Sequence, residues 1–322
     1  MQAGKTDLFD AIMDAHRALR PQLPPTPLTR SSALSALLDC EAWLKCDHLQ
    51  ATGAFKLRGA SNKIRLLNDT QRRQGVITSS TGNHGMAVAY AGSRAGVAVS
   101  VYLCTETKPM KIEAIRALGA DIVMVDGAPL DAELKARADA EAEGRIYISP
   151  YNDLDVVAGQ GTLGAEVFDQ QPDLDAIFLC TGCGGLTGGT GTALKHLSPK
   201  TQIVAVWPEN STALLRALEA GEIIDVPEQP TLSDGSAGAV EPGSVTFPIC
   251  QAVIDVRETV TEKEIAAAMR LVAETDRWMV EGAAGVALAG LIKTRERYRG
   301  KRVCVVLCGR NIALDTFLKA VI

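Results

Sequence analysis

The stretch IFLCTGCGGLTGGTG, residues 177–191, is the most informative part of the chain because it joins an apolar strand directly to a glycine-rich turn. Six of the ten residues from Gly182 to Gly191 are glycine. Such a turn can wrap a small phosphate with backbone N–H groups where the next helix begins. Two nucleotide motifs fail, because a dinucleotide fingerprint needs glycine at Thr187 and a Walker loop needs lysine at Thr190. We therefore expect a site for a smaller phosphate.

Outside this stretch, strand-like and helical segments alternate along most of the chain. The strand-like segments are residues 43–46, 76–79, 99–103, 122–125, 177–180, 203–206 and 303–307. The helical segments are residues 59–67, 83–95, 109–118, 129–143, 159–170, 187–196, 211–220, 261–276, 282–298 and a last helix from about 312. This alternation is typical of parallel sheets with helices on both faces. A length of 322 residues is enough for two such units.

The composition excludes several classes of protein. A net charge of -5 without a long basic run argues against a nucleic-acid partner. Residues 1–17 mix charges and lack an apolar segment, so we expect no signal peptide. The longest smooth apolar stretch, residues 282–292, is too short to span a bilayer. We therefore expect a cytoplasmic protein that does not bind membranes.

The eight cysteines allow two interpretations. Without a secretory signal they are expected to be reduced thiols, mostly buried. Cys180 and Cys183 form a CxxC pair, and Cys304 and Cys308 lie four apart, so the two pairs could make a four-sulfur zinc site. Both pairs lie where apolar strands run into glycine loops, and this favours positions beside a ligand over a zinc site.

Three further segments carry residue types suited to catalysis. In TGAFKLRGA (52–60), Lys56 follows an aromatic residue, and a lysine in an apolar pocket has a lowered pKa and becomes a nucleophile. The segment SSTGNHG (79–85) opens a helix, where hydroxyls and N–H groups favour an anion such as a carboxylate. The strand in VCVVLCGRN (303–311) ends at Cys308, and open α/β sheets hold ligands at such carboxyl ends.

Taken together, these segments resemble the serine/threonine dehydratases, a branch of the tryptophan-synthase-β-like, fold-type II pyridoxal-phosphate enzymes that also includes serine racemases. The resemblance extends from TPLTRS (26–31) to CGRN (308–311) and includes AGQGT (158–162) and EGAAG (281–285). It implies an α/β fold of two parallel-sheet, three-layer subdomains, with the cofactor in the cleft between them. The implied domains are a large one, residues 1–52 and 154–322, and a small one, residues 53–153.

The resemblance also assigns roles to single residues. Pyridoxal 5'-phosphate would be held as an imine on Lys56, with Phe55 near the ring, Asn83 on the ring hydroxyl oxygen and Cys308 facing the pyridine nitrogen. The backbone around its phosphate would be that of Gly182, Cys183, Gly184, Gly185 and Leu186. The substrate carboxylate would be held by the loop that contains Ser80, Thr81, Gly82 and His84. Lys56 and Thr81 are the predicted catalytic residues, and Lys56 would take the α-proton as general base.

The sequence departs from the family pattern in three places. Arg310 interrupts the glycines of the last motif, and Cys183 replaces a common glycine, which is harmless where only the backbone binds. Trp207 precedes Pro208 where racemase-like members carry an acidic ligand of a divalent cation. We therefore expect no metal, with the nearby Glu209 as the remaining candidate ligand.

The reaction implied by the resemblance is dehydration and deamination of a small β-hydroxy amino acid, such as L-threonine or L-serine, to a 2-oxo acid and ammonia. Elimination from a bulkier substrate (phenylserine, hydroxyaspartate or a hydroxyectoine-derived diamino acid) and serine racemisation are alternatives on the same fold. A catalytically silent protein that binds pyridoxal phosphate or an amino acid is the alternative from another class. We expect a homodimer, as is usual in the family, and no regulatory domain after the last helix.

Overall fold

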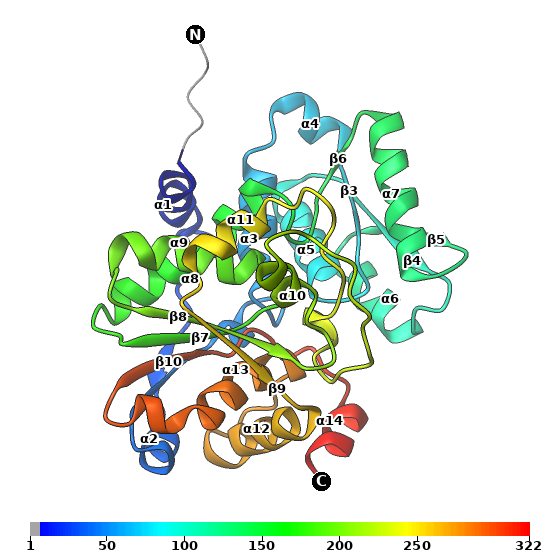
Figure 1. The fold of residues 1–322 in the computed structure, drawn as a ribbon. Helices are drawn as coiled ribbons and strands as arrows, with labels where there is room; N and C mark the ends of the chain where they lie inside the picture. Colours follow the sequence, from blue (N-terminus) through cyan, green and yellow to red (C-terminus); the bar gives the residue numbers. More distant parts are fainter. Residues whose placement is uncertain (1–6) are drawn as a thin grey trace.

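The computed structural model describes residues 7–322, which form two β-sheets flanked by helices (Figure 1). The six-stranded sheet has the order β1-β2-β10-β7-β8-β9, and the four-stranded sheet has the order β5-β4-β3-β6. The strands of the first are β1 (Leu28–Arg30), β2 (Glu41–Lys45), β7 (Ala176–Cys180), β8 (Gln202–Pro208), β9 (Val256–Val260) and β10 (Arg302–Val306). Those of the second are β3 (Val76–Ser79), β4 (Val99–Cys104), β5 (Asp121–Val125) and β6 (Ile146–Tyr147). Residues 1–6, part of the segment for which we expect no signal peptide, lie outside the described residues.

Helices connect most of these strands. They are α1 (Leu8–Leu19), α2 (Ser32–Leu38), α3 (Lys56–Arg65), α4 (Asp69–Gln74), α5 (Asn83–Ala95), α6 (Pro109–Arg116), α7 (Pro129–Glu143), α8 (Leu154–Gln170), α9 (Gly185–Leu197), α10 (Ala213–Ala220), α11 (Thr246–Val253), α12 (Glu262–Thr275), α13 (Gly282–Lys293) and α14 (Leu314–Val321). The short 3-10 helices that lie between these elements are η1 (Asp47–Leu49), η2 (Asp234–Ser236) and η3 (Arg295–Tyr298). Within residues 7–322, no helix has the length and apolarity needed to cross a membrane.

The six-stranded sheet is buried on both faces. Its strands pair in parallel, except that the edge strand β1 runs antiparallel to β2. Gly290 of α13 lies against Val206, and Gly191 of α9 lies toward Ile203. Val206 and Ile203 are an odd number of positions apart in β8, so they point to opposite faces. The helices on both faces explain why strands such as β7 are continuous apolar runs, as parallel strands usually are.

The four-stranded sheet is parallel throughout and is also covered on both faces. Val76 of β3 and Val101 of β4 belong to the apolar core formed with α3 and α5. Their neighbours Ile77 and Tyr102 pack instead with Ala136 of α7. This alternation of side chains is what a strand covered by helices on both faces requires.

Helix α8 joins the two halves of the molecule through glycines. A Cβ on Gly159 would lie 2.6 Å from the Cα of Gly59 in α3, and a Cβ on Gly161 would lie 2.9 Å from the carbonyl oxygen of Gly189 in α9. Only glycine permits backbones this close. The AGQGT motif therefore packs α8 against both α3 and α9.

The predicted segments are largely confirmed, and their boundaries differ for local reasons. The helices predicted at 83–95 and 129–143 are α5 and α7. Helix α8 begins at Leu154 rather than 159, because the Asp153 side chain accepts from the N–H groups of Asp155 and Val156 at its first turn. The helix predicted at 282–298 ends at Lys293 and continues as η3.

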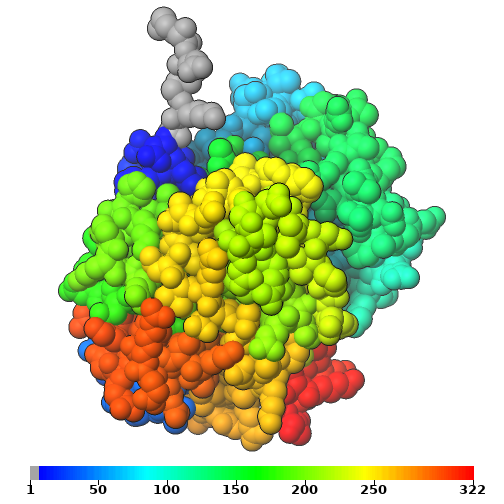
Figure 2. Space-filling view, viewed as in Figure 1, coloured from blue at the N-terminus to red at the C-terminus, as the bar shows by residue number. Residues whose placement is uncertain are grey.

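The helix predicted at 59–67 is α3, which begins three residues earlier, at Lys56. The short strands β1, β6 and β9 have weak sequence patterns and are not among the predicted segments. Residues 221–243, which follow α10, are mostly irregular. In the space-filling view this yellow-green segment lies on the outer surface next to α7 (Figure 2).

Candidate active site

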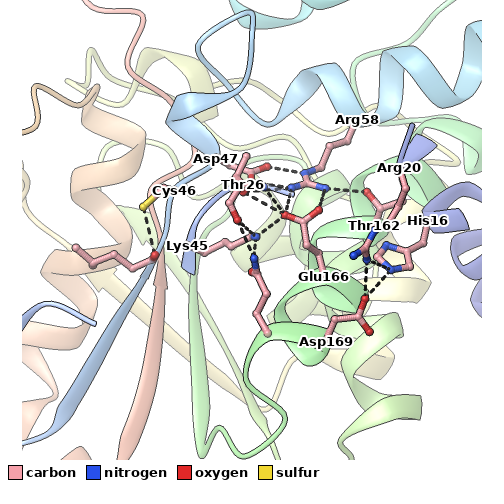
Figure 3. A network of polar contacts seen from close by, with 12 residues as sticks. His16, Arg20, Thr26, Lys45, Cys46, Asp47, Arg58, Thr162, Glu166 and Asp169 are labelled. Carbon is pink, nitrogen blue, oxygen red and sulfur yellow. Dashed lines mark hydrogen bonds and ion pairs between the residues drawn. The ribbon is translucent and has the colours of Figure 1, made fainter. Parts of the chain in front are cut away.

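A buried ion cluster anchors the helix that begins with Lys56. Arg58 of α3 donates to both oxygens of Asp47, at 2.7 and 2.9 Å, and to both oxygens of Glu166 in α8, at 3.0 Å each (Figure 3). Lys45 of β2 also donates to Glu166. These four residues, which we call the Arg58 cluster, are each at most 3% exposed. The cluster ties α3 to β2, η1 and α8 two residues after Lys56.

The Arg58 cluster is balanced in charge, with two cations and two anions. Burial alone would raise the pKa of Asp47 and Glu166, but the adjacent Arg58 guanidinium holds both below the usual carboxyl value. Burial lowers the pKa of Lys45, and the charge of Glu166 opposes this. Fully paired buried charges of this kind fix geometry because breaking one pair exposes an uncompensated charge.

Lys56 lies at the first position of α3, with its amine directed away from solvent. The amine donates to the carbonyl oxygen of Pro150 at 2.8 Å and lies 5.2 Å from the centre of the Phe55 ring. Burial lowers its pKa to about 8. The Phe55 N–H donates to the carbonyl oxygen of Cys308, so the Lys56 segment runs beside the last motif of the chain. A lysine with this pKa is partly neutral near pH 7 and can act as a nucleophile.

The glycine-rich loop forms a cradle at the start of α9, which begins at Gly185. Gly184 has a φ of +90°, a conformation that L side chains rarely adopt, and a Cβ there would lie 2.6 Å from the sulfur of Cys250. A Cβ on Gly182 would lie 2.5 Å from the carbonyl oxygen of Ser236. Glycine is therefore required at both positions, and the loop presents backbone N–H groups at a helix N-terminus.

Lys56 and this loop line one cavity of about 610 Å³. Of the predicted cofactor residues, all nine line it: Phe55, Lys56, Asn83, Gly182, Cys183, Gly184, Gly185, Leu186 and Cys308. Its lining comes from the end of β7, from helices that pack on either sheet (among them α3, α5, α7 and α9) and from the 221–243 segment.

A carboxylate for which the sequence predicts no role also lines the cavity. Glu281, at the start of α13, is 4% exposed and accepts from the Asn83 side chain at 2.9 and 3.1 Å and from the Asn311 N–H at 3.1 Å. Burial raises its pKa to about 7, with Asp234 adding to the shift and Asn83, Asn311 and Lys56 opposing it. In the sequence, Glu281 is an acidic residue directly before an apolar helix, and this pattern is typical of an ordinary helix start.

The comparisons with known proteins agree with this geometry. Over residues 19–309 the chain matches the family described as pyridoxal-phosphate dependent enzyme. The chain belongs to this family. It is 35% identical to an L-threonine ammonia-lyase of Thermotoga maritima, over 95% of this chain and 76% of that protein. It is 30% identical to a serine racemase of Schizosaccharomyces pombe, over 96% of this chain and 95% of that protein.

The similarity extends to solved structures. The processed form of threonine deaminase isoform 2 from Solanum lycopersicum superposes with a TM-score of 0.93 at 32% identity, covering 98% of this chain and 93% of that one. The predicted fold class, the membership of the serine/threonine dehydratase family and the cofactor are thereby confirmed.

The residues present fit pyridoxal phosphate. A phosphate needs a cradle of N–H groups that side chains do not fill, and the glycines at 182 and 184 leave that space. An imine needs a lysine that is not held in an ion pair, and the Lys56 amine contacts a carbonyl oxygen. A pyridoxal-phosphate enzyme therefore has both of its main anchoring elements in this one cavity.

The predicted substrate loop lies beside the cavity rather than among the side chains that line it. Ser80, Thr81 and Gly82 are partly exposed ahead of α5, and the Gly82 N–H donates to the Ser80 hydroxyl at 3.2 Å. His84 is buried, and its Nε2 lies 3.0 Å from the carbonyl oxygen of Ile148. Burial lowers the pKa of His84 to about 3, so its imidazole is neutral at any physiological pH.

The cysteines and the last departures from the family pattern can also be placed. Cys180, Cys183 and Cys308 line the cavity, whereas Cys304 lies in the apolar core of the six-stranded sheet. Trp207 is buried in a separate apolar cluster. Among residues 7–322, no three histidine, cysteine, aspartate or glutamate side chains are grouped so that they could hold a metal ion.

Proposed function

We propose that this protein is an ammonia-lyase that removes water from a small β-hydroxy amino acid and releases a 2-oxo acid and ammonia. The observation that carries the proposal is that Lys56, the phosphate-type loop and the thiol of Cys308 line one cavity. The relative from Thermotoga maritima is named an L-threonine ammonia-lyase, which supports L-threonine or L-serine as the substrate.

Lys56 is proposed to act as the base at the α-carbon. When bound, pyridoxal phosphate supplies an electron-withdrawing ring that acidifies the α-C–H of an amino acid joined to it. The lowered pKa of Lys56, about 8, matches the requirement that a general base be partly neutral near working pH. Its position at the rigidly anchored end of α3 holds the amine at a fixed place in the cavity.

Cys308 is proposed to favour elimination. Burial raises the pKa of its thiol well above the usual value, so the sulfur stays protonated and uncharged. A neutral thiol could not stabilise a positive charge on the pyridine nitrogen as a carboxylate would. Pyridoxal phosphate held against Cys308 would therefore withdraw electrons less strongly, and this would favour loss of the β-hydroxyl.

The loop from Ser80 to Gly82 is proposed to bind the substrate carboxylate, with Thr81 as a catalytic residue. It precedes α5, where hydroxyls and N–H groups at the N-terminus of the helix favour an anion. Because the His84 side chain contacts Ile148, we propose that it supports this loop from behind and does not itself bind the carboxylate.

Two alternatives differ in the substrate side chain or the outcome. Hydroxyaspartate would need a cation for its second carboxylate, but Lys56 is the one basic side chain among the residues that line the described cavity. Acidic side chains there include Glu133, Asp225, Glu241 and Glu281, so the lining disfavours that substrate. The similarity to a serine racemase keeps racemisation as the second candidate outcome.

We further propose the assembly and location expected for such an enzyme. The large domain would be residues 1–52 and 154–322, and the small domain residues 53–153, with two chains forming a homodimer in the cytoplasm. The eight cysteines are free and are buried or half-buried, which suits a reducing compartment.

A substrate panel tests the proposed function. Purified protein is assayed with L-threonine, L-serine, phenylserine, hydroxyaspartate and a hydroxylated diamino acid for 2-oxo acid and ammonia, with chiral analysis of the remaining substrate. We expect the highest kcat/KM for L-threonine or L-serine, and at least a thousandfold loss for Lys56→Ala, as is common for loss of a catalytic group. Activity that survives in Lys56→Ala would contradict the assigned role.

A further inference from the structure

A line of hydrogen bonds runs past the cavity through two side-chain amides. The Asn311 Nδ2 donates to the carbonyl oxygen of Thr52 at 2.8 Å and to the Asn83 Oδ1 at 2.6 Å. The Asn83 Nδ2 in turn donates to the two carboxylate oxygens of Glu281. We call these four residues the Asn83 chain.

The Thr52 end of the Asn83 chain fixes the direction of its hydrogen bonds. A backbone carbonyl oxygen only accepts, so the amide NH2 of Asn311 must face Thr52. The same NH2 reaches Asn83, so Asn83 must present its Oδ1 there and its own NH2 to Glu281. The backbone N–H of Asn311 also donates to Glu281, which satisfies a second acceptor site on the carboxylate. The orientation of the Asn83 amide is therefore set by the protein before any ligand is bound.

Packing leaves little room for another arrangement. A Cβ on Gly309 would collide with the carboxylate of Glu281. A Cβ on Gly53, whose φ is +75°, would lie 2.5 Å from the Oδ1 of Asn311. The two glycines let the backbone pack closely against these side chains, so neither can turn without displacing its neighbours.

We propose that Glu281 and Asn311 are positioning residues that hold Asn83 so that an N–H, rather than its carbonyl oxygen, faces the ring oxygen of pyridoxal phosphate. The proposal rests on the assigned contact between Asn83 and the cofactor. One hydrogen of the Asn83 NH2 serves Glu281, and the other remains for the cavity, which Asn83 lines. A donor stabilises the negatively charged form of the ring oxygen, whereas a carbonyl oxygen in its place would repel it.

The test measures two properties of the purified holoenzyme: the dissociation constant for pyridoxal phosphate and the pH midpoint of the visible absorbance of its imine. We expect Glu281→Gln and Asn311→Ala each to weaken cofactor binding by roughly tenfold, the effect of one unsatisfied polar group. The pH midpoint should rise in both, because loss of the donor favours the protonated ring oxygen. Asn83→Ala should have the same effect, and Asn83→Ala/Glu281→Gln should be no worse than Asn83→Ala alone.

Asn62→Ala is the matched control. Asn62 is also a buried amide that is held at both ends, by the carbonyl oxygen of Asp155 and by Arg65, but it does not line the cavity. It should lower stability and leave the pH midpoint unchanged.

Each remaining outcome contradicts one of the two proposals. Additive effects of Asn83→Ala and Glu281→Gln, or an unchanged pH midpoint in both positioning variants, would overturn the positioning role and leave the proposed function standing. A native protein that develops no visible absorbance with pyridoxal phosphate would overturn the proposed function, and this inference with it. If Glu281→Gln does not fold, Asn311→Ala decides the question.

Discussion

The Arg58 cluster and the Asn83 chain are both buried and polar, but they differ in charge balance and in what they face. The Arg58 cluster pairs two cations with two anions within the protein interior. The Asn83 chain has one carboxylate, held by amide donors without a direct ion pair, and it borders the cavity. The first arrangement keeps carboxyl pKa values low, whereas in the second burial raises that of Glu281 to about 7 because the amide donors only partly oppose it.

This difference separates a structural polar group from a functional one. Paired charges remain ionised over a wide pH range and therefore hold one geometry. A carboxylate whose neighbours are amides can change its protonation state near neutral pH, as groups at ligand sites often do. Within this molecule, partner charge rather than depth of burial distinguishes the two.

The largest effect should come from breaking the Arg58 cluster. Arg58→Met leaves Asp47 and Glu166 with only Lys45 as a buried cation, so we expect a loss of about 3–5 kcal/mol in the free energy of unfolding. Urea denaturation at pH 7 measures it. A loss below 1 kcal/mol would show that the cluster is not the anchor of α3.

The pH dependence of stability should then separate the two regions. The low pKa of Asp47 and Glu166 gives stability that is present above the ordinary carboxyl pKa and is lost as the pH falls. The raised pKa of Glu281 has the opposite sign, because ionising it costs stability as the pH rises from 4.5 through about 7.

We therefore compare the free energy of unfolding of Glu281→Gln with that of the native protein at each pH. The difference in favour of the variant should be larger at pH 8 than at pH 5, by on the order of 3 kcal/mol. Urea denaturation of protein stripped of cofactor, at both pH values, measures the difference. Equal pH dependence in the two proteins would mean that Glu281 titrates normally.

The smallest effect should come from a partly exposed ion pair on the same helix. Lys63 of α3 contacts Asp153 at 2.7 Å and Asp155 at 2.9 Å, both beside the start of α8. Like Arg58→Met, Lys63→Met removes a cation that links α3 and α8. The Lys63 ion pairs are in contact with water, so we expect a loss of at most about 1 kcal/mol in the free energy of unfolding. A loss as large as that of Arg58→Met would mean that burial adds nothing to the anchor.

The sequence predicts what depends on local pattern. The alternation of strands and helices gives the fold class, and the glycines from Gly182 to Gly191 identify the phosphate-type loop because their chemistry lies in consecutive residues. Lys56 is recognisable from its motif. The edge strand β9 (Val256–Val260) is not recognisable from the sequence, because Arg257 and Glu258 interrupt its apolar pattern. As an edge strand it pairs with a neighbouring strand on one side alone.

The Asn83 chain could not be predicted in the same way. Asn83 and Glu281 are 198 positions apart, and their contact depends on how α5 and α13 are placed by two different sheets. Nothing in EGAAG distinguishes a carboxylate that faces a cavity from one that begins a helix. The resemblance to a family supplied the role of Asn83, but the direction of its amide required the structure.

The glycine contacts of α8 have a mechanical consequence. At Gly159 and at Gly161 the backbone of α8 lies directly against the backbones of α3 and α9. The two elements that would anchor pyridoxal phosphate are the Lys56 amine and the cradle at Gly185. Both are thus attached to one stiff frame of packed helices. The walls formed by α7 and residues 221–243 lie outside that frame. They can change in shape and charge to admit a different side chain without altering the span between amine and cradle.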